Sequence, residues 1–205
     1  MSVAILARPK RIRRAPINLR VDVARDLNDL VAVIALRSLV YIGEQHCPLA
    51  EEFDGNDLTG STHIVAKLDG EPVAALRLRW FAGFVKVERV LVKYEHRGDD
   101  AAIARALLTF ALDLARRRGY RRALAYAQSR LSSFWRRMGF TPRIERERFV
   151  FSDHEYVEFE AELAPHETPL TMDSDPYTLM RPDGRWDGPG VLDRSAARPA
   201  SNPHR

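Results

Sequence analysis

The sequence predicts an α/β domain built on a mixed, mostly antiparallel central sheet with helices on its faces. Three strand-like segments follow one another between residues 62 and 92 with short turns between them, which is typical of an antiparallel meander. A helical segment over residues 101–118 then joins the last of these strands to another apolar strand, as in a parallel βαβ unit. A closing hairpin and a tail rich in Pro, Gly and Asp complete the chain.

The composition allows one domain with a packed core, since 45% of the 205 residues are hydrophobic. The single cysteine, Cys47, cannot form an internal disulfide, and no Cys and His residues have metal-ligand spacing, so we expect a reducing compartment and no metal. No apolar run is long enough to span a membrane, and the short "VAILA" precedes its basic residues, unlike a secretory signal. We therefore expect a soluble, cytoplasmic protein.

Basic residues near the start contribute to the net charge of +4. No aromatic residue interleaves them to stack on bases, so we expect residues 1–16 to be a solvated arm rather than a nucleic-acid-binding one. The main domain is predicted over residues 17–164. The tail, residues 165–205, has too little apolar surface for its own core, and two outcomes stay open: packing along the domain or a partner subunit, or disorder.

The first elements are a strand and a helix. "INLRVDVA", residues 17–24, alternates apolar and polar residues like a strand. Asp26 then begins a helical pattern. Its apolar residues near one face are Leu27, Leu30, Val31, Ile34 and Leu39. A polar, turn-rich segment over residues 41–60 follows, and loops of this length inside a compact domain tend to be functional.

The next segments are the strands "THIVAKLDG", "EPVAALRLRWF" and "FVKVERVLV". Asp69-Gly70 separates the first two, and both residues tolerate the positive φ of a tight hairpin. From Ala101 apolar residues recur at helical spacing until Gly119, which is placed to end the helix. "RRALAYA" is then a buried strand, "FWRRM" a short helix, and "RERFVF" with "EYVEFEAEL" the closing hairpin.

This order of elements, together with three motifs, resembles the GNAT acetyltransferase superfamily over roughly residues 17–163. "FWRRMGF" is similar to the "FYxxxGF" signature, "SDHEYVEFEAEL" resembles the terminal hairpin, and "YIGEQHCPLAEEFDGND" resembles the "VFVxEQxCPYxExDxxD" segment of one bacterial subgroup. The resemblance implies a GNAT fold, in which two central parallel strands splay apart. It also implies transfer of an acetyl or other acyl group from coenzyme A to an amine.

In this family the pantetheine arm of the cofactor lies between the splayed strands and bonds to the backbone of the first one. The resemblance therefore implies that Val90, Leu91 and Val92 bind this arm. It implies acetyl-CoA or another acyl-CoA as co-substrate and a small primary amine as acceptor.

The family holds the pyrophosphate at a helix N-terminus, with the pattern Arg or Gln, two residues, Gly, one residue, Gly or Ala. Here that pattern falls on Asp99, Ala102 and Ala104. The carboxylate of Asp99 would repel a diphosphate by on the order of 1 kcal/mol at about 4 Å in water, and by more near a protein surface. We expect Asp99 or Asp100 to cap the helix instead, while Arg97-Gly98 supplies the cationic contact. The alternative is a loop that binds coenzyme A poorly.

Glu88 is the predicted general base, because it interrupts an apolar strand beside the expected gap. Unbroken alternation would place it on the same face as Val90 and Val92. Glu44 is the second candidate. A structural role for Glu88 also stays open, in an ion pair with one of its neighbouring cations, Lys86, Arg77 or Arg89.

The family's usual general acid is the Tyr of "FY", but Trp135 stands at that position, where it would line the cofactor site. An indole N–H donates a hydrogen bond but is no proton source. Tyr126, Ser132 or Ser133 would then supply the proton, or the thiolate would take it from solvent or from the product.

Two further functions stay open. The first takes the acyl group from an acyl carrier protein, as GNAT-like autoinducer and N-acyl amino acid synthases do. The second is a non-catalytic GNAT-like binding module, which Asp99 and Trp135 together favour. Acidic residues of the 41–60 segment, among them Asp54 and Asp57, would either recognise the amine or cap turns. Nucleic acid is the weakest candidate partner, and a homodimer is left open.

Overall fold

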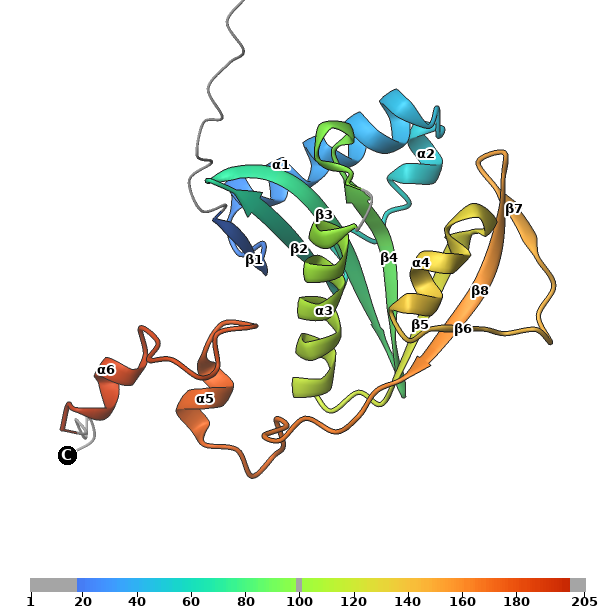
Figure 1. The fold of residues 1–205 in the computed structure, drawn as a ribbon. Helices are drawn as coiled ribbons and strands as arrows, with labels where there is room; N and C mark the ends of the chain where they lie inside the picture. Colours follow the sequence, from blue (N-terminus) through green and yellow to red (C-terminus); the bar gives the residue numbers. More distant parts are fainter. Residues whose placement is uncertain (1–17, 99–100, 200–205) are drawn as a thin grey trace, which may run out of the picture.

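The structure, a computed structural model, describes residues 18–98 and 101–199 (Figure 1). Within these residues an eight-stranded sheet runs in the order β1-β2-β3-β4-β5-β8-β6, and β7 pairs with β8. The strands are β1 Leu19–Val23, β2 Ser61–Leu68, β3 Glu71–Phe81, β4 Phe84–Val92, β5 Arg122–Gln128, β6 Thr141–Pro142, β7 Phe149–Phe151 and β8 His154–Glu162. The α-helices are α1 Leu27–Arg37, α2 Leu49–Glu52, α3 Ala102–Arg117, α4 Ser132–Arg137, α5 Pro176–Met180 and α6 Asp193–Ala196. The basic arm predicted over residues 1–16 lies outside the described residues.

The sheet confirms the predicted fold class. The strand pair β4–β5 is parallel, and the other paired strands of the described chain are antiparallel. Helix α3 forms the crossover between β4 and β5, as the βαβ pattern predicted (Figure 1). The sheet is therefore mixed and mostly antiparallel, with helices on its faces.

The predicted hairpin at Asp69-Gly70 is confirmed. It joins β2 to β3, and its two turn residues have φ of 51° and 94°. Two successive residues with positive φ fit the twist of an antiparallel pair, and Asp and Gly tolerate that conformation better than most residues. The turn chemistry thus sets the register of the first two meander strands.

Each face of the sheet carries its own core. On one face, α3 residues such as Leu107 and Leu108 pack with Ile64 and Leu76. On the other face, α1 residues pack with Val65. Side chains at successive positions of a strand point to opposite faces, so β2 and β3 read as nearly continuous apolar runs because both of their faces are covered.

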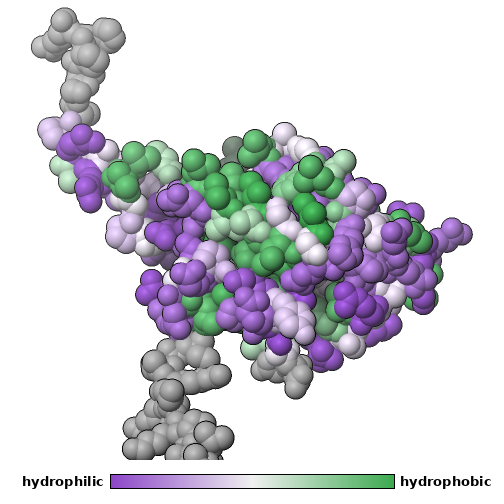
Figure 2. Space-filling model, turned by 90° about the horizontal axis from the view of Figure 1, so that it is seen from above, coloured by the Kyte–Doolittle hydropathy of each residue, from purple (hydrophilic) through white to green (hydrophobic). Residues whose placement is uncertain are grey.

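Helix α1 begins as predicted, because Asp26 is its N-cap and accepts a hydrogen bond from the Asp29 N–H at 2.8 Å. The predicted buried face is wrong. Leu27, Val31 and Leu39 are 72%, 54% and 48% exposed, whereas the buried apolar residues are Val33, Leu36 and Val40. The segment holds two apolar stripes, and packing against the sheet selects the second one. Figure 2, which looks down on the side of α1 and α2, shows hydrophobic residues gathered in the middle of this face.

The segment over residues 41–60 is more ordered than its turn-rich sequence predicted. Helix α1 continues directly into the π-helix η1, Ser38–Glu44, and the short helix α2 follows. Shorter 3₁₀ turns, η2 Tyr94–His96 and η3 Ser129–Leu131, follow β4 and β5.

The parallel pairing of β4 with β5 is short. It joins residues 85–87 to residues 123–125 and goes no further, although β4 extends to Val92 and β5 to Gln128. The two strands therefore diverge over their last residues, as the resemblance implied.

A β-bulge at Arg89 bends β4 near this point. The register with β3 shifts there, and Arg89 has a positive φ of 55°. The extra residue reverses the alternation of side chains, so Val87 and Val90 both contact the α3-side core although three positions separate them. The prediction that Glu88 shares a face with Val90 and Val92 is therefore wrong, because it assumed unbroken alternation.

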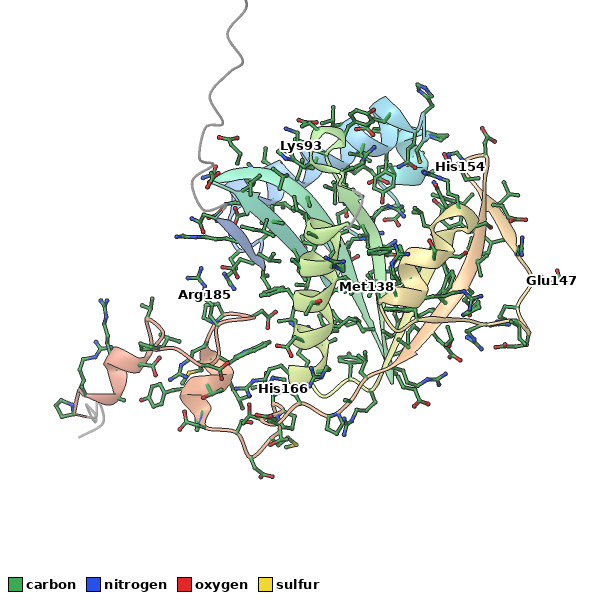
Figure 3. The ribbon with its side chains drawn as sticks, viewed as in Figure 1. Lys93, Met138, Glu147, His154, His166 and Arg185 are labelled. Atoms are coloured by element: carbon green, nitrogen blue, oxygen red, sulfur yellow. The ribbon has the colours of Figure 1, made fainter. Side chains whose placement is uncertain are left out.

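The tail packs along the domain, the first of its two predicted outcomes. Trp186 is 5% exposed and belongs to the α3-side core. Arg185 points toward β1 (Figure 3) and donates to Asp22 Oδ2 at 2.8 Å, while Arg117 on α3 donates to Asp187 at 2.7 Å. The tail thus lacks a core of its own and uses that of the domain. No helix of residues 18–98 and 101–199 is long and apolar enough to cross a membrane.

Candidate active site

A cleft of about 770 Å³ opens where β4 and β5 diverge. Its walls come from the last residues of both strands, the loop before α3, the first turn of α3, helices α2 and α4, and strands β7 and β8. The cleft contains most of the predicted site residues. They are Glu88, Val90, Leu91, Val92, Arg97, Gly98, Ala104, Tyr126 and Trp135.

Ala102 and Glu44 lie outside the cleft wall, as do two of the alternative candidates, Ser132 and Asp57. Ala102 is the first residue of α3 and is exposed to solvent, although its neighbours Ala101 and Ile103 line the cleft. Glu44 lies on η1 and reaches the cleft through an ion pair, since its Oε2 is 2.6 Å from an Arg97 guanidinium nitrogen. Glu44 is therefore engaged with the loop before α3.

One end of the cleft combines an apolar strand with a helix N-terminus. The first turn of an α-helix presents backbone N–H groups and the positive end of the helix dipole, and Ile103 and Ala104 bring that turn into the cleft wall. Helix α3 has no acidic residue in its first turn to oppose an anion. This end, which we call the donor end, is suited to a ligand with a negatively charged group.

Helix α3 begins with a residue in the left-handed backbone region. The N-cap residue of α3 is Ala101, with φ of 52° and no side-chain hydrogen bond. Asp99 and Asp100 themselves lie outside the described residues. That Asp99 or Asp100 caps this helix therefore stays a prediction.

Arginines line the cleft, and one of them, Arg97, lies in the loop before α3. Arg97 is held in place because its Nε donates to the Val92 carbonyl oxygen at 2.8 Å and its guanidinium lies over the Tyr94 ring at 5.6 Å. Arg130 and Arg137 line the wall as well. Arg97 strengthens the attraction of the donor end for an anion, and Arg130 and Arg137 add positive charge to the cleft as a whole.

Tyr41 is a cleft residue that sequence reasoning missed. Its hydroxyl donates to the Val90 carbonyl oxygen at 3.0 Å, at the point where β4 has left β5. Burial, followed by the charge of Glu52, raises the pKa of the Tyr41 phenol far above its ordinary value, so it remains a donor. Its position at the start of the "YIGEQHC" motif was the available signal.

Glu88 lies at the other end of the cleft and is 8% exposed. Both of its oxygens are engaged by cations: Oε1 lies 2.8 Å from Arg77 Nη2, and Oε2 lies 2.9 Å from Lys86 Nζ. The structural role left open for Glu88 is thus observed as a pair of contacts. If Glu88 accepted a proton, it would lose its ion pair with Arg77 or with Lys86.

A buried charge network continues behind Glu88, and the sequence did not predict it. Arg77 and Arg37 are 0% and 1% exposed. Arg77 donates to Asp54 Oδ2 at 2.6 Å and to Asp57 Oδ1 at 2.8 Å, and Arg37 donates to Glu52 and Asp57. Two arginines at these depths require paired carboxylates, because an unpaired buried charge is strongly unfavourable.

Titration in this network follows burial and pairing. Burial opposes the charge of Asp54, but hydrogen bonds from Arg77 outweigh it and lower the pKa of Asp54. Burial likewise opposes the charge of Asp57, whose pKa is lowered by bonds from Arg37 and Arg77. For Glu52 the balance is the opposite. Burial raises its pKa, and the positive charges of Arg89 and Arg37, which lower it, do not offset this effect. Asp54 and Asp57 are therefore arginine partners.

Four aromatic residues line the end of the cleft where Glu88 lies, and we call them the aromatic wall. They are Tyr126, Phe149, Phe151 and Tyr156. Tyr126 meets Phe149 edge-on at 5.2 Å, and Phe149 stacks on Tyr156 at 5.8 Å. Burial, and then the charge of Glu158, raise the pKa of Tyr126, so its phenol is protonated at neutral pH. Tyr126 thus brings a protonated phenol to the cleft wall.

Trp135 is a buried residue of the cleft wall. It is 4% exposed and packs edge-on against Phe140 at 4.9 Å while also lining the cleft. Trp135 therefore separates the cleft from the α3-side core.

Comparison with known proteins agrees with this geometry. A sequence model described as the acetyltransferase (GNAT) family matches residues 30–140. The uncharacterised N-acetyltransferase YjcF of Bacillus subtilis (strain 168) is 30% identical over 128 residues, 61% of this chain and 87% of that protein. The crystal structure of an acyl-CoA N-acyltransferase from Pseudomonas aeruginosa is 28% identical, with a TM-score of 0.62 over 71% of this chain and 99% of its own.

The crystal structure of Escherichia coli ElaA is 27% identical to this chain, with a TM-score of 0.62. The match covers 71% of this chain and 100% of ElaA. The family match extends from within α1 to beyond α4 and so contains both diverging strands and the first turn of α3. The chain therefore belongs to the GNAT family of acetyltransferases.

Proposed function

We propose that this protein transfers an acyl group, acetyl in the simplest case, from coenzyme A to the primary amine of a small molecule. The observation that carries the proposal is the cleft between β4 and β5, which joins an apolar strand to the N-terminus of α3. A long, thin thioester with a charged end suits such a cleft. The name of the similar Pseudomonas aeruginosa protein, an acyl-CoA N-acyltransferase, supports the same reaction class.

The donor end would bind the coenzyme A part of the substrate. Backbone groups of Val90 to Val92 would contact the pantetheine arm, and the first turn of α3 would receive the pyrophosphate. Arg97 would add a cation beside it, with its position set by Val92 and Glu44.

The reaction requires an uncharged amine nitrogen, which attacks the thioester carbonyl carbon. The new C–N bond forms as the C–S bond breaks, the amine loses a proton to a base, and the departing thiolate gains one. Glu88 is the proposed base, at the cost of one of its ion pairs, and Tyr126 is the proposed proton donor. Holding both substrates in one cleft also lowers the barrier by orienting them.

A transfer assay tests the proposal. Purified protein is given acetyl-CoA and a panel of primary amines, and release of the coenzyme A thiol and formation of the amide are measured. A parallel reaction supplies acyl groups on an acyl carrier protein, since the arginines of the cleft would also attract an acidic carrier. Transfer from acetyl-CoA supports the proposal. Transfer from the carrier alone would refute coenzyme A as donor, and no transfer together with no acyl-CoA binding would indicate a binding module.

A charge reversal tests the donor end separately. Arg97→Glu should weaken coenzyme A binding in calorimetric titration by about tenfold or more, since an attraction becomes a repulsion. Arg121→Glu is the matched control, because Arg121 is exposed and does not line the cleft. Equal affinities of the two variants would contradict the proposed placement of the pyrophosphate.

A further inference from the structure

The carboxylate of Glu51, on α2, differs from the other acidic groups at the aromatic end of the cleft. Glu51 lines the cleft, and its Oε2 is buried with no hydrogen-bond partner. No ion pair within the described residues involves it, whereas Glu52, Asp54 and Glu88 are each held by an arginine. A buried acceptor without a donor is unfavourable, so a ligand that brings a donor to this oxygen is stabilised there.

Glu51 and the aromatic wall are linked by one side chain. Arg89 donates to the Glu51 carbonyl oxygen at 2.8 Å, and its guanidinium carbon lies 5.7 Å from the centre of the Phe151 ring. Phe151 in turn meets Tyr156 edge-on at 5.7 Å. The carboxylate and the aromatic rings therefore belong to one end of the cleft.

We propose that Glu51 recognises the acceptor by binding its ammonium group, and that the acceptor is a monoamine with an aromatic body that packs on the aromatic wall. The inference rests on the proposed function, which it makes more specific. Rings that stack and meet edge-on with one another offer the same contacts to an aromatic ligand. An ammonium supplies the donor that Glu51 Oε2 lacks.

The surrounding charges favour one ammonium over several. The other carboxylates of this end are already paired with arginine, so a second ammonium of a polyamine would find no free anion among the described residues. The nearby cations are also paired: Lys86 with Glu88, and Arg89 with Glu52 and Asp54. Neither of these two cations is therefore free to pair with the carboxylate of an amino acid substrate. A single amine on an apolar body fits what remains.

Steady-state kinetics test this assignment with acetyl-CoA as donor. The wild type should use 2-phenylethylamine with a kcat/KM at least about tenfold above that of putrescine or lysine. Glu51→Gln should raise the KM for 2-phenylethylamine by about 10- to 100-fold and leave the KM for acetyl-CoA unchanged. Glu95→Gln is the matched control, since Glu95 is exposed, pairs with Lys93 and does not line the cleft.

Binding without chemistry separates this inference from the proposed function. The melting temperature of the wild type should rise with 2-phenylethylamine, and the rise should be lost in Glu51→Gln but kept in Glu95→Gln. If acetyl-CoA binds and no amine is acylated, the proposed function fails, and this measurement still decides the role of Glu51. Equal shifts in all three proteins, no shift in the wild type, or a preference for putrescine would overturn the assignment.

Discussion

Individual residues of the cleft derive their roles from partners that lie far away in the sequence. Glu88 meets Arg77 from the neighbouring strand, and Tyr41 reaches Val90 across 49 positions of chain. Arg77 and Glu88 are nearly or fully removed from water and Tyr41 is half-buried, and an unpaired polar group is unfavourable in such places. Single substitutions at this scale should therefore have measurable effects.

Glu88→Gln tests the proposed base. We expect kcat to fall by about 100-fold or more with little change in the KM for acetyl-CoA, because the amine would lose its proton acceptor. Glu71→Gln, at an exposed position of β3, should retain full kcat. A Glu88→Gln variant with normal kcat but a lower melting temperature would show that Glu88 serves only as the partner of Arg77 and Lys86.

Tyr41→Phe removes the hydroxyl that donates to the Val90 carbonyl oxygen. The free energy of unfolding should fall by about 1 kcal/mol, since that acceptor loses its donor at a buried site. Tyr94→Phe is the control, because Tyr94 is 74% exposed and should change stability by no more than about 0.5 kcal/mol. Urea unfolding of both variants gives the comparison, and equal stabilities would contradict a structural role for this bond.

His63 on β2 predicts a pH dependence of stability. It is 6% exposed, its Nε2 lies 3.0 Å from the Asp57 carbonyl oxygen, and burial lowers its pKa. The unfolded chain therefore binds a proton more readily than the folded one, so the contribution of His63 is complete above about pH 6.5 and is lost as the pH falls below that value.

The free energy of unfolding of the wild type should accordingly decrease between about pH 7.5 and 5.5. His63→Gln should flatten this decrease, whereas His154→Gln, at the tip of the β7–β8 hairpin (Figure 3), should not. A His63→Gln variant with the slope of the wild type would refute the assignment.

Among the elements, the hairpins and the bulge determine how the strands are paired. The β2–β3 turn sets the register on one side of the meander, and the bulge at Arg89 changes it between β3 and β4. Because of that change, β4 turns its last residues away from β5, and the cleft opens there. Local backbone geometry thus accounts for the opening of the cleft.

Gly70→Ala tests the hairpin. Gly70 has φ of 94°, and a Cβ added at this position would have no atom within 4 Å, so the cost is that of the backbone conformation alone. We expect a loss of about 1–2 kcal/mol in the free energy of unfolding. Gly43→Ala, in η1, should cause no loss, because its φ is not positive and its nearest contact is an ordinary 3.7 Å. Similar losses in both variants would contradict the turn argument.

In the whole molecule, the tail and the domain share one core. Arg25 donates to the Asp183 carbonyl oxygen, Arg118 pairs with Asp183, and Trp186 fills the α3-side core. None of these residues lines the cleft. The tail should therefore contribute to stability without affecting catalysis directly.

Trp186→Ala should lower the free energy of unfolding by about 3–5 kcal/mol, as expected for a large buried side chain. At temperatures where the variant is folded, its KM for acetyl-CoA should match that of the wild type. Met172→Ala, at a position 98% exposed, is the control and should not change stability. A Trp186→Ala variant as stable as this control would show that the tail does not share the core.

Much of the fold could be predicted because its signals are local. Asp69-Gly70, the helical spacing after Ala101 and the alternation in the strands each depend on a few neighbouring residues. The predicted face of α1 was wrong for the opposite reason: the segment contains two apolar stripes, and only the sheet selects between them. The bulge at Arg89 has no local signal of this kind, since an arginine is an unusual residue at positive φ.

By itself, the sequence determined the order of the strands and helices and the parallel crossover, because each depends on spacing along the chain, and its motifs showed the resemblance to the family. Only the tertiary structure decided which carboxylates are paired and which one lines the cleft without an ion pair. Glu44, Glu51 and Glu88 look alike as sequence, yet Arg97 engages the first and Arg77 the third, while Glu51 faces the cleft without a cation. Pairing of charges depends on distance in space, and distance in space is established only when the chain has folded.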